Sequence, residues 1–340
     1  MLSPSFSLKN KKAFFVLAFL MAVLPIDLRA QTVGTTTADI LKINEGARPA
    51  AMGGVYTAMG NDAYSVSYNP AGLANLKATQ VLLLHLDSLA SIEYEYLVFA
   101  TAWGSGNVLA ANLTYRHEPP IDNQNGTPAV NADDLLGSLS YATKLGNDFR
   151  AGATVKYLKS DLASFSATAV GFDAGVQLDH IKNPICEFID KSWRVYNSIG
   201  LSVQNLGTGM TFDPASSADP LPMFIRGGLG FHTVIDDTKD LNWGLEIFKP
   251  SDQDIKMGVG GEFWMFPELF AIRAGYKFEQ LGKWTGNVFD NYTLGCTLTR
   301  RLEGDDFSLD LAYNPATFTS TSEDTFFFAL NLKFNQLRIF

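Results

Sequence analysis

The stretch Thr325-Phe-Phe-Phe-Ala-Leu-Asn-Leu-Lys-Phe334 alternates between apolar and polar side chains. The apolar positions are Phe328, Leu330, Leu332 and Phe334, and the polar positions between them are Asn331 and Lys333. Successive side chains of a β-strand point to opposite faces, so a period of two places each set on one face. The stretch therefore predicts a strand whose two faces meet different surroundings.

The same alternation fills the chain upstream of this stretch. In Phe307-Ser-Leu-Asp-Leu-Ala-Tyr313 the large apolar residues occupy the odd positions, and in Phe270 to Phe278 they oppose Arg273 and Lys277. Such segments predict fourteen strands, near residues 78–87, 90–103, 107–116, 134–145, 148–159, 165–181, 193–205, 222–235, 240–249, 254–266, 268–278, 289–300, 305–314 and 325–334. Most have about ten residues or more, which suits a tilted crossing of a bilayer better than a soluble sheet.

The lengths of the connections support a membrane barrel. The connections at one end are mostly short, as at Gly104-Ser-Gly106 and Gly146-Asn147, and those at the other are longer, as at Glu118–Asp133 and Leu206–Leu221. Outer-membrane barrels have short periplasmic turns and longer external loops. Only a closed barrel satisfies the backbone of strands in lipid. We therefore predict an all-β chain forming a 14-stranded antiparallel transmembrane β-barrel over residues 78–340, in contact with outer-membrane lipid.

Residues 1–30 read as a targeting segment. Lys9, Lys11 and Lys12 precede the apolar run Ala13–Ile26, and Leu28-Arg29-Ala30 ends in a small residue. This order is typical of a cleaved signal peptide, and the run is shorter than the roughly 20 residues of a spanning helix. We expect export to the bacterial outer membrane. A last strand ending in an aromatic residue resembles the signal read by the barrel-assembly machinery, and either Phe334 or Phe340 can be that end.

Charge, cysteine and histidine content exclude several classes of protein. Without residues 1–30 the chain keeps 22 Lys and Arg against 34 Asp and Glu, which argues against binding nucleic acid. Cys186 and Cys296 are too few for a zinc site, and the four histidines are scattered, so we expect no metal and no cofactor. Whether the two cysteines pair stays open. No nucleophile motif is present, and we expect no enzyme.

Glycine-rich stretches and aromatic residues have structural interpretations. Gly227-Gly228-Leu229-Gly230 and Gly258-Val-Gly-Gly261 do not join a strand to a helix, so they are not phosphate loops. Glycine in a barrel strand relieves crowding or permits bending. Several aromatic residues near strand ends predict girdles at the lipid interfaces: Tyr94, Tyr96, Phe99, Trp103, Trp193, Tyr196, Trp264 and Phe266.

Residues 31–77 differ from the rest, being rich in small residues and irregular. We expect this segment, with a short helix after Asn61-Asp62, to pack at one mouth of the barrel or inside it. Its motifs are Gly46-Ala-Arg-Pro-Ala-Ala-Met-Gly-Gly-Val-Tyr56, Asn61-Asp62-Ala63 and Tyr68-Asn-Pro-Ala-Gly-Leu-Ala74. A second group of motifs comprises Leu201-Ser-Val-Gln-Asn-Leu-Gly207, Asp219-Pro-Leu-Pro222 and Arg226-Gly-Gly-Leu-Gly230.

These motifs, in this order, resemble the FadL-like outer-membrane proteins and in particular the PorV/PorQ group. The resemblance implies a fourteen-stranded barrel with an N-terminal segment plugging its lumen. It implies plug or lumen roles for Gly46, Arg48, Met52, Gly53, Gly54, Asn69, Pro70 and Gly72. PorV-type members act in type IX secretion, where they receive cargo with a C-terminal sorting domain and pass it to partner proteins. FadL moves hydrophobic molecules inward.

Two sets of residues allow more than one interpretation. Asn69-Pro70-Ala71-Gly72 can form a gate whose Asn69 bonds the wall, or a turn fixed by Pro70 and Gly72, and the two are compatible. The strand register points seven charges inward: Lys156, Arg226, Glu262, Arg273, Lys277, Asp310 and Lys333. They can line a polar conduit or ligand site. We favour a salt-bridged interior, because buried charges must be paired.

Three functions remain. The favoured hypothesis is a PorV/PorQ-type component of type IX secretion that docks or shuttles secreted cargo proteins with other secretion components, using loops Glu118–Asp133 and Leu206–Leu221. The second is a FadL-like importer of hydrophobic small molecules, which predicts an apolar pocket near Met52, Tyr56 and Tyr64. The third is a secreted soluble β-protein.

Overall fold

The protein is described from a computed structural model. It describes residues 35–43, 46–88, 92–121, 130–182, 194–213, 215–266, 269–278, 291–315 and 325–335. The predicted signal peptide, Phe340, Trp193 and Cys186 lie outside these residues. Cys296 is described and stands half-buried on a strand, with no disulfide.

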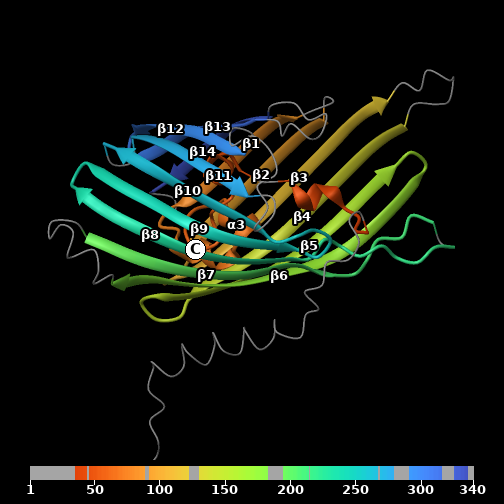
Figure 1. Cartoon of the computed structure of the whole chain (residues 1–340), viewed down its shortest axis with the longest axis horizontal. Coiled ribbons are helices and arrows are strands. Elements are labelled where there is room, and N and C mark those ends of the chain that lie inside the picture. The colour runs from red at the N-terminus through yellow and green to blue at the C-terminus, as the bar shows by residue number, and fades with distance from the viewer. Residues whose placement is uncertain are drawn as a thin grey trace, which may run out of the picture.

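Fourteen strands of the described chain close into one barrel (Figure 1). They are β1 (Thr79–Ser88), β2 (Ile92–Trp103), β3 (Asn107–Ile121), β4 (Val130–Lys144), β5 (Phe149–Leu162), β6 (Phe165–Lys182), β7 (Arg194–Gly207), β8 (Phe224–Asp236), β9 (Lys239–Pro250), β10 (Lys256–Met265), β11 (Phe270–Phe278), β12 (Tyr292–Leu302), β13 (Asp305–Asn314) and β14 (Thr325–Phe334). Each pairs antiparallel with its neighbours in sequence, and β1 pairs with β14 from Thr79 opposite Phe334 to Asp87 opposite Phe326. The predicted barrel is confirmed.

The strand boundaries agree with the prediction to within three residues, except at the end of β3 and the start of β4. Strand β3 continues to Ile121 instead of ending near residue 116, and β4 starts at Val130 instead of 134. The apolar alternation stops where the lipid stops, whereas backbone pairing continues beyond it. The expected loop Glu118–Asp133 is therefore shorter than predicted, and its central part, 122–129, lies outside the described residues.

Apolar side chains cover the outside of the barrel. On β14 Phe328 is 48% exposed, whereas Asn331, from the opposite face, is 4% exposed. Leu139, Leu298 and many other large apolar residues are likewise exposed. A soluble protein rarely exposes so continuous an apolar surface. The exterior therefore suits a hydrocarbon environment, and the alternative of a soluble secreted β-protein does not fit it.

Three aromatic residues expected in the lipid girdles lie inside the barrel instead. Tyr94 and Tyr96 are 0% and 1% exposed. Trp264 shares the inward register of Glu262 on β10, and its ring lies under the Arg273 guanidinium, 5.7 Å from the ring centre. Their position near strand ends suggested a girdle, but the parity of the strand decides the face, and here it is inward.

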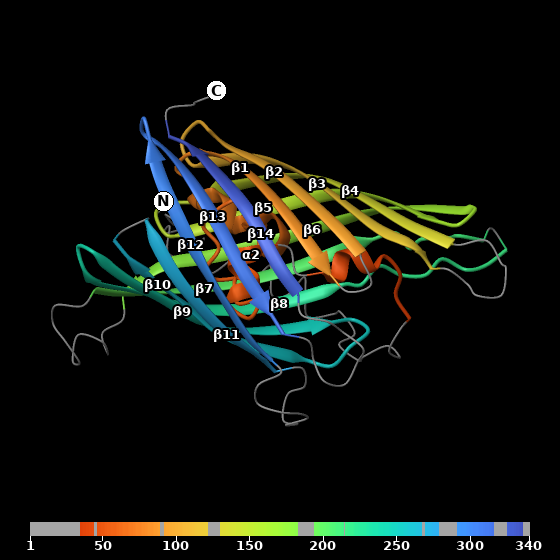
Figure 2. The ribbon, with the colours of Figure 1, turned by 90° about the horizontal axis from the view of Figure 1, so that it is seen from above.

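Within the described residues, four short helices lie in the lumen and at its mouth (Figure 2): η1 (Asp39–Lys42), α2 (Ala47–Ala51), α3 (Ser65–Tyr68) and η2 (Pro70–Asn75). Helix α2 contacts β11 to β14, and η2 contacts β3 to β6. Residues 46–75, which we call the plug, are almost all buried. No helix among the described residues is long and apolar enough to span a bilayer.

Turn lengths orient the barrel. The turns β2–β3, β4–β5, β8–β9 and β12–β13 are short and lie at one end, where β1 begins and β14 ends. Short turns face the periplasm in such barrels, so the opposite end is extracellular. The two-residue turn at 163–164 between β5 and β6 lies at the extracellular end and is an exception.

Candidate functional site

The plug enters the lumen through a glycine-rich turn. Gly46 has φ 119°, and a Cβ there would lie 2.3 Å from the Tyr64 ring, so only glycine fits. Met52 is fully buried. Gly53 and Gly54 have φ 66° and 80°, and they reverse the chain after α2. These motif glycines form the turns before and after α2, and the plug packs against the barrel wall on either side of them.

Arg48 on α2 joins the plug to the barrel wall. It donates from Nε and Nη2 to both carboxylate oxygens of Glu262 on β10, at 3.0 and 2.5 Å. Its Nη1 donates to three plug side chains: Asp62 at 2.6 Å, Asn61 at 2.8 Å and Tyr56 at 2.9 Å. Such a fork to a carboxylate fixes orientation as well as charge. Arg48 is therefore the central residue of the plug–wall contact.

The wall continues this network across three strands. Arg273 on β11 donates from Nε to Glu262 at 3.0 Å and lies 3.6 Å from Asp310 on β13. Thr297 on β12 accepts from Arg273 at 2.5 Å and donates to Asp310. The plug reaches the same carboxylate, because the Tyr64 hydroxyl donates to Asp310 at 3.0 Å. The plug and four wall strands thus share one buried network.

A second anchor involves Glu246 on β9. Its Oε2 accepts from the backbone N–H groups of Tyr56 and Thr57, at 2.8 and 2.9 Å. Its Oε1 accepts from Arg226 Nη1 at 3.0 Å, and the Arg226 guanidinium lies over the Phe248 ring at 3.9 Å. One carboxylate therefore holds both the plug backbone and a wall arginine, which leaves Arg226 no free charge for a ligand.

The remaining predicted charges lie apart from these anchors. Lys156 pairs with Asp173 at 2.8 Å and donates to Asn205 at 2.7 Å. Lys277 lies on β11 beside a cavity of about 170 Å³ at the extracellular mouth. Lys333 stands opposite Asp306 at the periplasmic end of β14. The structure thus gathers four of the seven charges, Arg226 and Glu262 with Arg273 and Asp310, at or near the two plug anchors.

Asn69 acts both as a turn residue and as a wall contact. Its side chain accepts from the Ala71 N–H at 3.1 Å, which caps η2 above Pro70. Its amide donates to Thr57 O at 2.7 Å and to Val176 O on β6 at 3.1 Å. Gly72 lies close against the Gly60 carbonyl, 2.7 Å from where a Cβ would stand. The two interpretations of this motif therefore coexist.

A row of inward-facing wall glycines was missed as a site. Each lies where a Cβ would stand 3.0 Å or less from the plug: Gly152, Gly175, Gly200, Gly228, Gly230, Gly244, Gly258, Gly260, Gly275 and Gly295. Several pair directly across strands, as Gly152 with Gly175 and Gly260 with both Gly244 and Gly275. We call these residues the glycine track. The sequence signal was glycine at inward parity on eight consecutive strands, β5 to β12.

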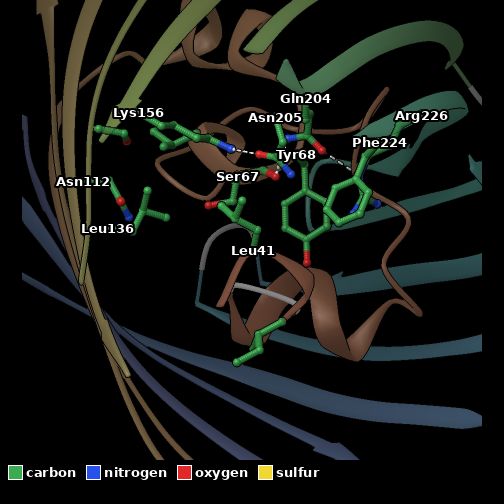
Figure 3. A pocket seen from close by; sticks show the side chains of 13 residues that line it. Leu41, Ser67, Tyr68, Asn112, Leu136, Lys156, Gln204, Asn205, Phe224 and Arg226 are labelled. Carbon is green, nitrogen blue, oxygen red and sulfur yellow. Dashed lines mark hydrogen bonds between the residues drawn. The ribbon is translucent and has the colours of Figure 1, made fainter. Parts of the chain in front are cut away.

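Little space remains between the plug and strands β3 to β8. The cavity between the plug and β3 to β8 measures about 30 Å³ and is lined by Tyr68, Asn112, Lys156, Gln204 and Arg226, among others (Figure 3). Such a volume holds one or two waters. Where an apolar pocket was expected, the side chains of Met52, Tyr56 and Tyr64 are fully buried in the described part of the chain, and both tyrosine hydroxyls donate hydrogen bonds to carboxylates. The plug fills the place where a ligand would bind.

Residues 35–43, which we call the strap, hold the extracellular end of the lumen. Thr36 Oγ1 donates to Asp252 at 2.5 Å, and Lys42 pairs with the same carboxylate at 3.0 Å, in the turn between β9 and β10. Thr37 N–H donates to Pro220 O at 3.1 Å. Burial alone would raise the pKa of Asp252, but the hydrogen bonds from Thr36 and Lys42 outweigh it and lower that pKa. Burial would lower the pKa of Lys42, but its bonds with the carboxylates raise it.

These shifts predict a pH window for the strap. A lowered carboxylate pKa stabilises the folded contact above the ordinary value of about 3.9, and this stabilisation is lost as pH falls through the lower folded value. The contribution of Lys42 is lost only above about pH 10.4. We expect amide protection of 37–43 at neutral pH, its loss as pH falls through the lowered pKa of folded Asp252, and its loss at pH 7 in Asp252→Asn. Hydrogen exchange checks this, with the exposed Asp254→Asn as the matched control. Equal protection in both variants would contradict it.

Within the described ranges, no three His, Cys, Asp or Glu side chains lie together as metal ligands.

Comparison with known proteins identifies a family to which the sequence is similar. The profile of the family described as "Type IX secretion system protein PorV" matches residues 27–251, well over half of the chain. A curated relative, the UPF0164 protein of Treponema pallidum (strain Nichols), is 28% identical over 170 residues. That match covers 48% of this chain and 42% of the relative, so the chain spans less than half of the relative's length.

Solved structures share the fold. The toluene transporter TodX of Pseudomonas putida superposes with a TM-score of 0.51 at 12% identity, over 86% of this chain and 98% of that one. The toluene transporter TbuX of Ralstonia pickettii gives 0.50 at 10% identity, over 85% and 97%. At such identities the likeness concerns the barrel fold alone.

Proposed function

The chain belongs to the PorV family of type IX secretion system proteins, and on this premise we propose that it docks or shuttles exported cargo at its extracellular face. As a member of that family and a closed FadL-like barrel, it is an outer-membrane barrel associated with type IX secretion. The proposal concerns what it does there. Its partners would be cargo polypeptides and other secretion components.

The filled lumen carries the proposal. A pore or channel needs a continuous path, but the plug is held by two buried anchors and leaves cavities of about 30 Å³ toward β3 to β8 and about 170 Å³ beside Gly53 and Gly54. Every strand pair of the described barrel is hydrogen-bonded, so no lateral gap is open in the wall. A barrel closed in both directions offers partners its rim and loops, where recognition usually resides.

The extracellular rim has two features that suit it to binding a partner. Strands β3 to β6 have 14 to 18 residues, against 9 to 11 in β10 to β14, so one side of the barrel rises above the membrane. The segment between β7 and β8 folds back on itself through paired bonds of Met210 and Asp219 at 2.9 Å. This segment, one of the two loops predicted to bind partners, is therefore held in a closed turn at the extracellular end.

The alternative is import of hydrophobic small molecules. It is supported by the fold shared with the toluene transporters, but the chain would need to move the plug first. The mouth holds a further cavity of about 390 Å³, lined by Leu86, Ile92, Tyr94 and Phe327 together with Arg116, Lys42 and others. Import of a hydrophobic molecule would have to begin in this cavity. Uptake of apolar compounds is therefore the measurement that distinguishes import from secretion.

Deleting the gene separates the two functions. We expect the deletion strain to lose type IX cargo from its culture medium and to regain it on complementation, measured by quantitative proteomics of the medium. Uptake of apolar compounds should stay at the wild-type level. An unchanged secretome together with reduced apolar uptake would instead establish the importer.

A further inference from the structure

The raised side of the barrel ends in a four-stranded sheet with two lateral edges. Strands β3, β4, β5 and β6 stay paired up to their extracellular ends, from Glu118 opposite Ala132 to Leu162 opposite both Ala132 and Phe165. Figure 1 shows these strands reaching beyond the others. The first edge is on β3, facing β2, and the second is on β6, facing β7.

The edge of β6 is unpaired over its first five residues. Strand β7 ends at Gly207, opposite Gly171, and Thr208 then donates to Val170 O at 3.0 Å while its hydroxyl accepts from Val170 N–H at 3.1 Å. The N–H and the C=O of Val170 therefore both point toward β7. Residues two apart along a strand point their backbone N–H and C=O groups to the same side. Thr168 and Ser166 therefore present two N–H and two C=O groups, and no hydrogen bond in the described part of the chain engages them.

The chain that could cover this edge turns away from it. After Thr208 it runs inward, where Met210 is 0% exposed and bonds Asp219. Ser166 and Thr168 remain exposed on the outside of the sheet, and Phe165, which has the inward parity of Ala167 and Ala169, is exposed at the extracellular end of the strand. The edge is therefore open to solvent on the extracellular side.

The two edges differ in their protection. The β3 edge carries Pro119 and Pro120, which have no N–H to offer, and proline is a common device against unwanted strand pairing. The β6 edge from Phe165 to Ala169 has no proline and no charged residue. An open edge with good β-formers is a site for strand addition. One edge is blocked and the other is left available.

We infer that the β6 edge, Phe165–Ala169, binds an extended strand of the exported cargo by β-sheet augmentation. The inference rests on the proposed function and names its contact. Backbone hydrogen bonds tolerate different side chains, which suits a component that receives more than one cargo.

A second copy of the chain does not fit this edge. Two barrels in one membrane share their orientation, so they are related by rotation about the membrane normal. Barrel strands tilt by roughly 35–45°, and a two-fold rotation would therefore cross the two β6 strands at about 70–90°. Strands at that angle cannot form a ladder, whereas a strand outside the membrane is free to align.

Proline at the edge tests the inference. Thr168→Pro removes one outward N–H and no bond within the described barrel, whereas Thr168→Ala keeps the backbone. The cargo is a protein that the deletion strain fails to release, purified and mixed with the full-length barrel in detergent. We expect at least tenfold weaker binding for Thr168→Pro, and for Ser166→Pro, and wild-type binding for Thr168→Ala. Heat-modifiable migration in gels verifies that each variant is folded.

Hydrogen exchange tests the same contact in the wild-type protein, without any substitution. The amides of Ser166 and Thr168 should exchange rapidly in the free protein and become protected when cargo binds. Wild-type affinity in both proline variants, or unchanged exchange at both amides in the complex, overturns the edge contact while secretion still depends on the gene. A deletion strain with a normal secretome overturns the proposed function itself. Protection at equal levels without cargo would point to pairing between copies and would also overturn the inference.

Discussion

Replacing Arg48 with methionine is expected to release the plug. The change removes from Asp62 its Arg48 cation and leaves Glu262 with Arg273 alone, in a site where the side chains of Asp62 and Glu262 are 6% and 0% exposed. Removing one partner of a buried ion pair costs about 3–5 kcal/mol, because the other charge stays desolvated. The anchor also loses both bonds of the Arg48–Glu262 fork. The plug should then leave its seat in a large fraction of molecules, since the fork is its main contact with β10.

Two measurements report this release. Residues 46–75 should lose amide protection, and the purified variant should conduct ions in planar bilayers where the wild type does not. Arg301→Met is the matched control, because that side chain is 54% exposed and its pair with Asp306 contributes at most about 1 kcal/mol. Adding Asp62→Asn to Arg48→Met should recover part of the protection, because one unpaired carboxylate is removed. An Arg48→Met variant that conducts no ions and keeps full amide protection of residues 46–75 would show that the plug does not depend on this anchor.

Replacing Gly260 with alanine should displace the same plug from the opposite side of the contact. The new Cβ would stand 2.1 Å from Met52 O and 2.6 Å from Met52 C. These are backbone atoms, so no side-chain rotation relieves the clash. Overpacking typically costs about 1–3 kcal/mol, and a clash with fixed backbone belongs at the upper end. We expect a folded barrel whose plug is loosened.

Gly137→Ala is the control for this change. Gly137 faces outward on β4 and has nothing within 4 Å of an added Cβ. Both variants should keep heat-modifiable migration, but only Gly260→Ala should expose 46–75 to protease added to the purified protein. Gly275→Ala should act like Gly260→Ala, since its Cβ would meet Gly53 N at 2.3 Å. If all three variants resisted the protease equally, the glycine track would have no part in seating the plug.

If the proposed function is correct, these two variants also separate the plug from secretion. A plug that only seals the barrel should make the outer membrane leaky when displaced, while cargo still reaches the medium. Loss of secretion in both variants would instead place the plug in cargo handling. The two variants act from different sides of the contact, because Arg48 lies in the plug whereas Gly260 lies in the wall strand β10 and faces Met52 of the plug.

The barrel followed from the sequence because its signal is local. A lipid-facing strand must alternate, and each alternating stretch, such as Phe307 to Tyr313, reveals its own two faces. Inward parity also pointed Glu262, Arg273 and Asp310 into the lumen. Tyr94, Tyr96 and Trp264 were assigned to girdles because proximity to a strand end was considered without parity.

Contacts between distant parts of the chain were decided only by the tertiary structure. Arg48 and Glu262 are 214 residues apart, and nothing near either one specifies the other. The glycine track exists only because closure of the barrel aligns one or two glycines from each of eight strands beneath the plug. The open edge of β6 likewise depends on where β7 ends. Alternation fixes which face a side chain takes, whereas the partner it meets there is set by how the whole sheet closes.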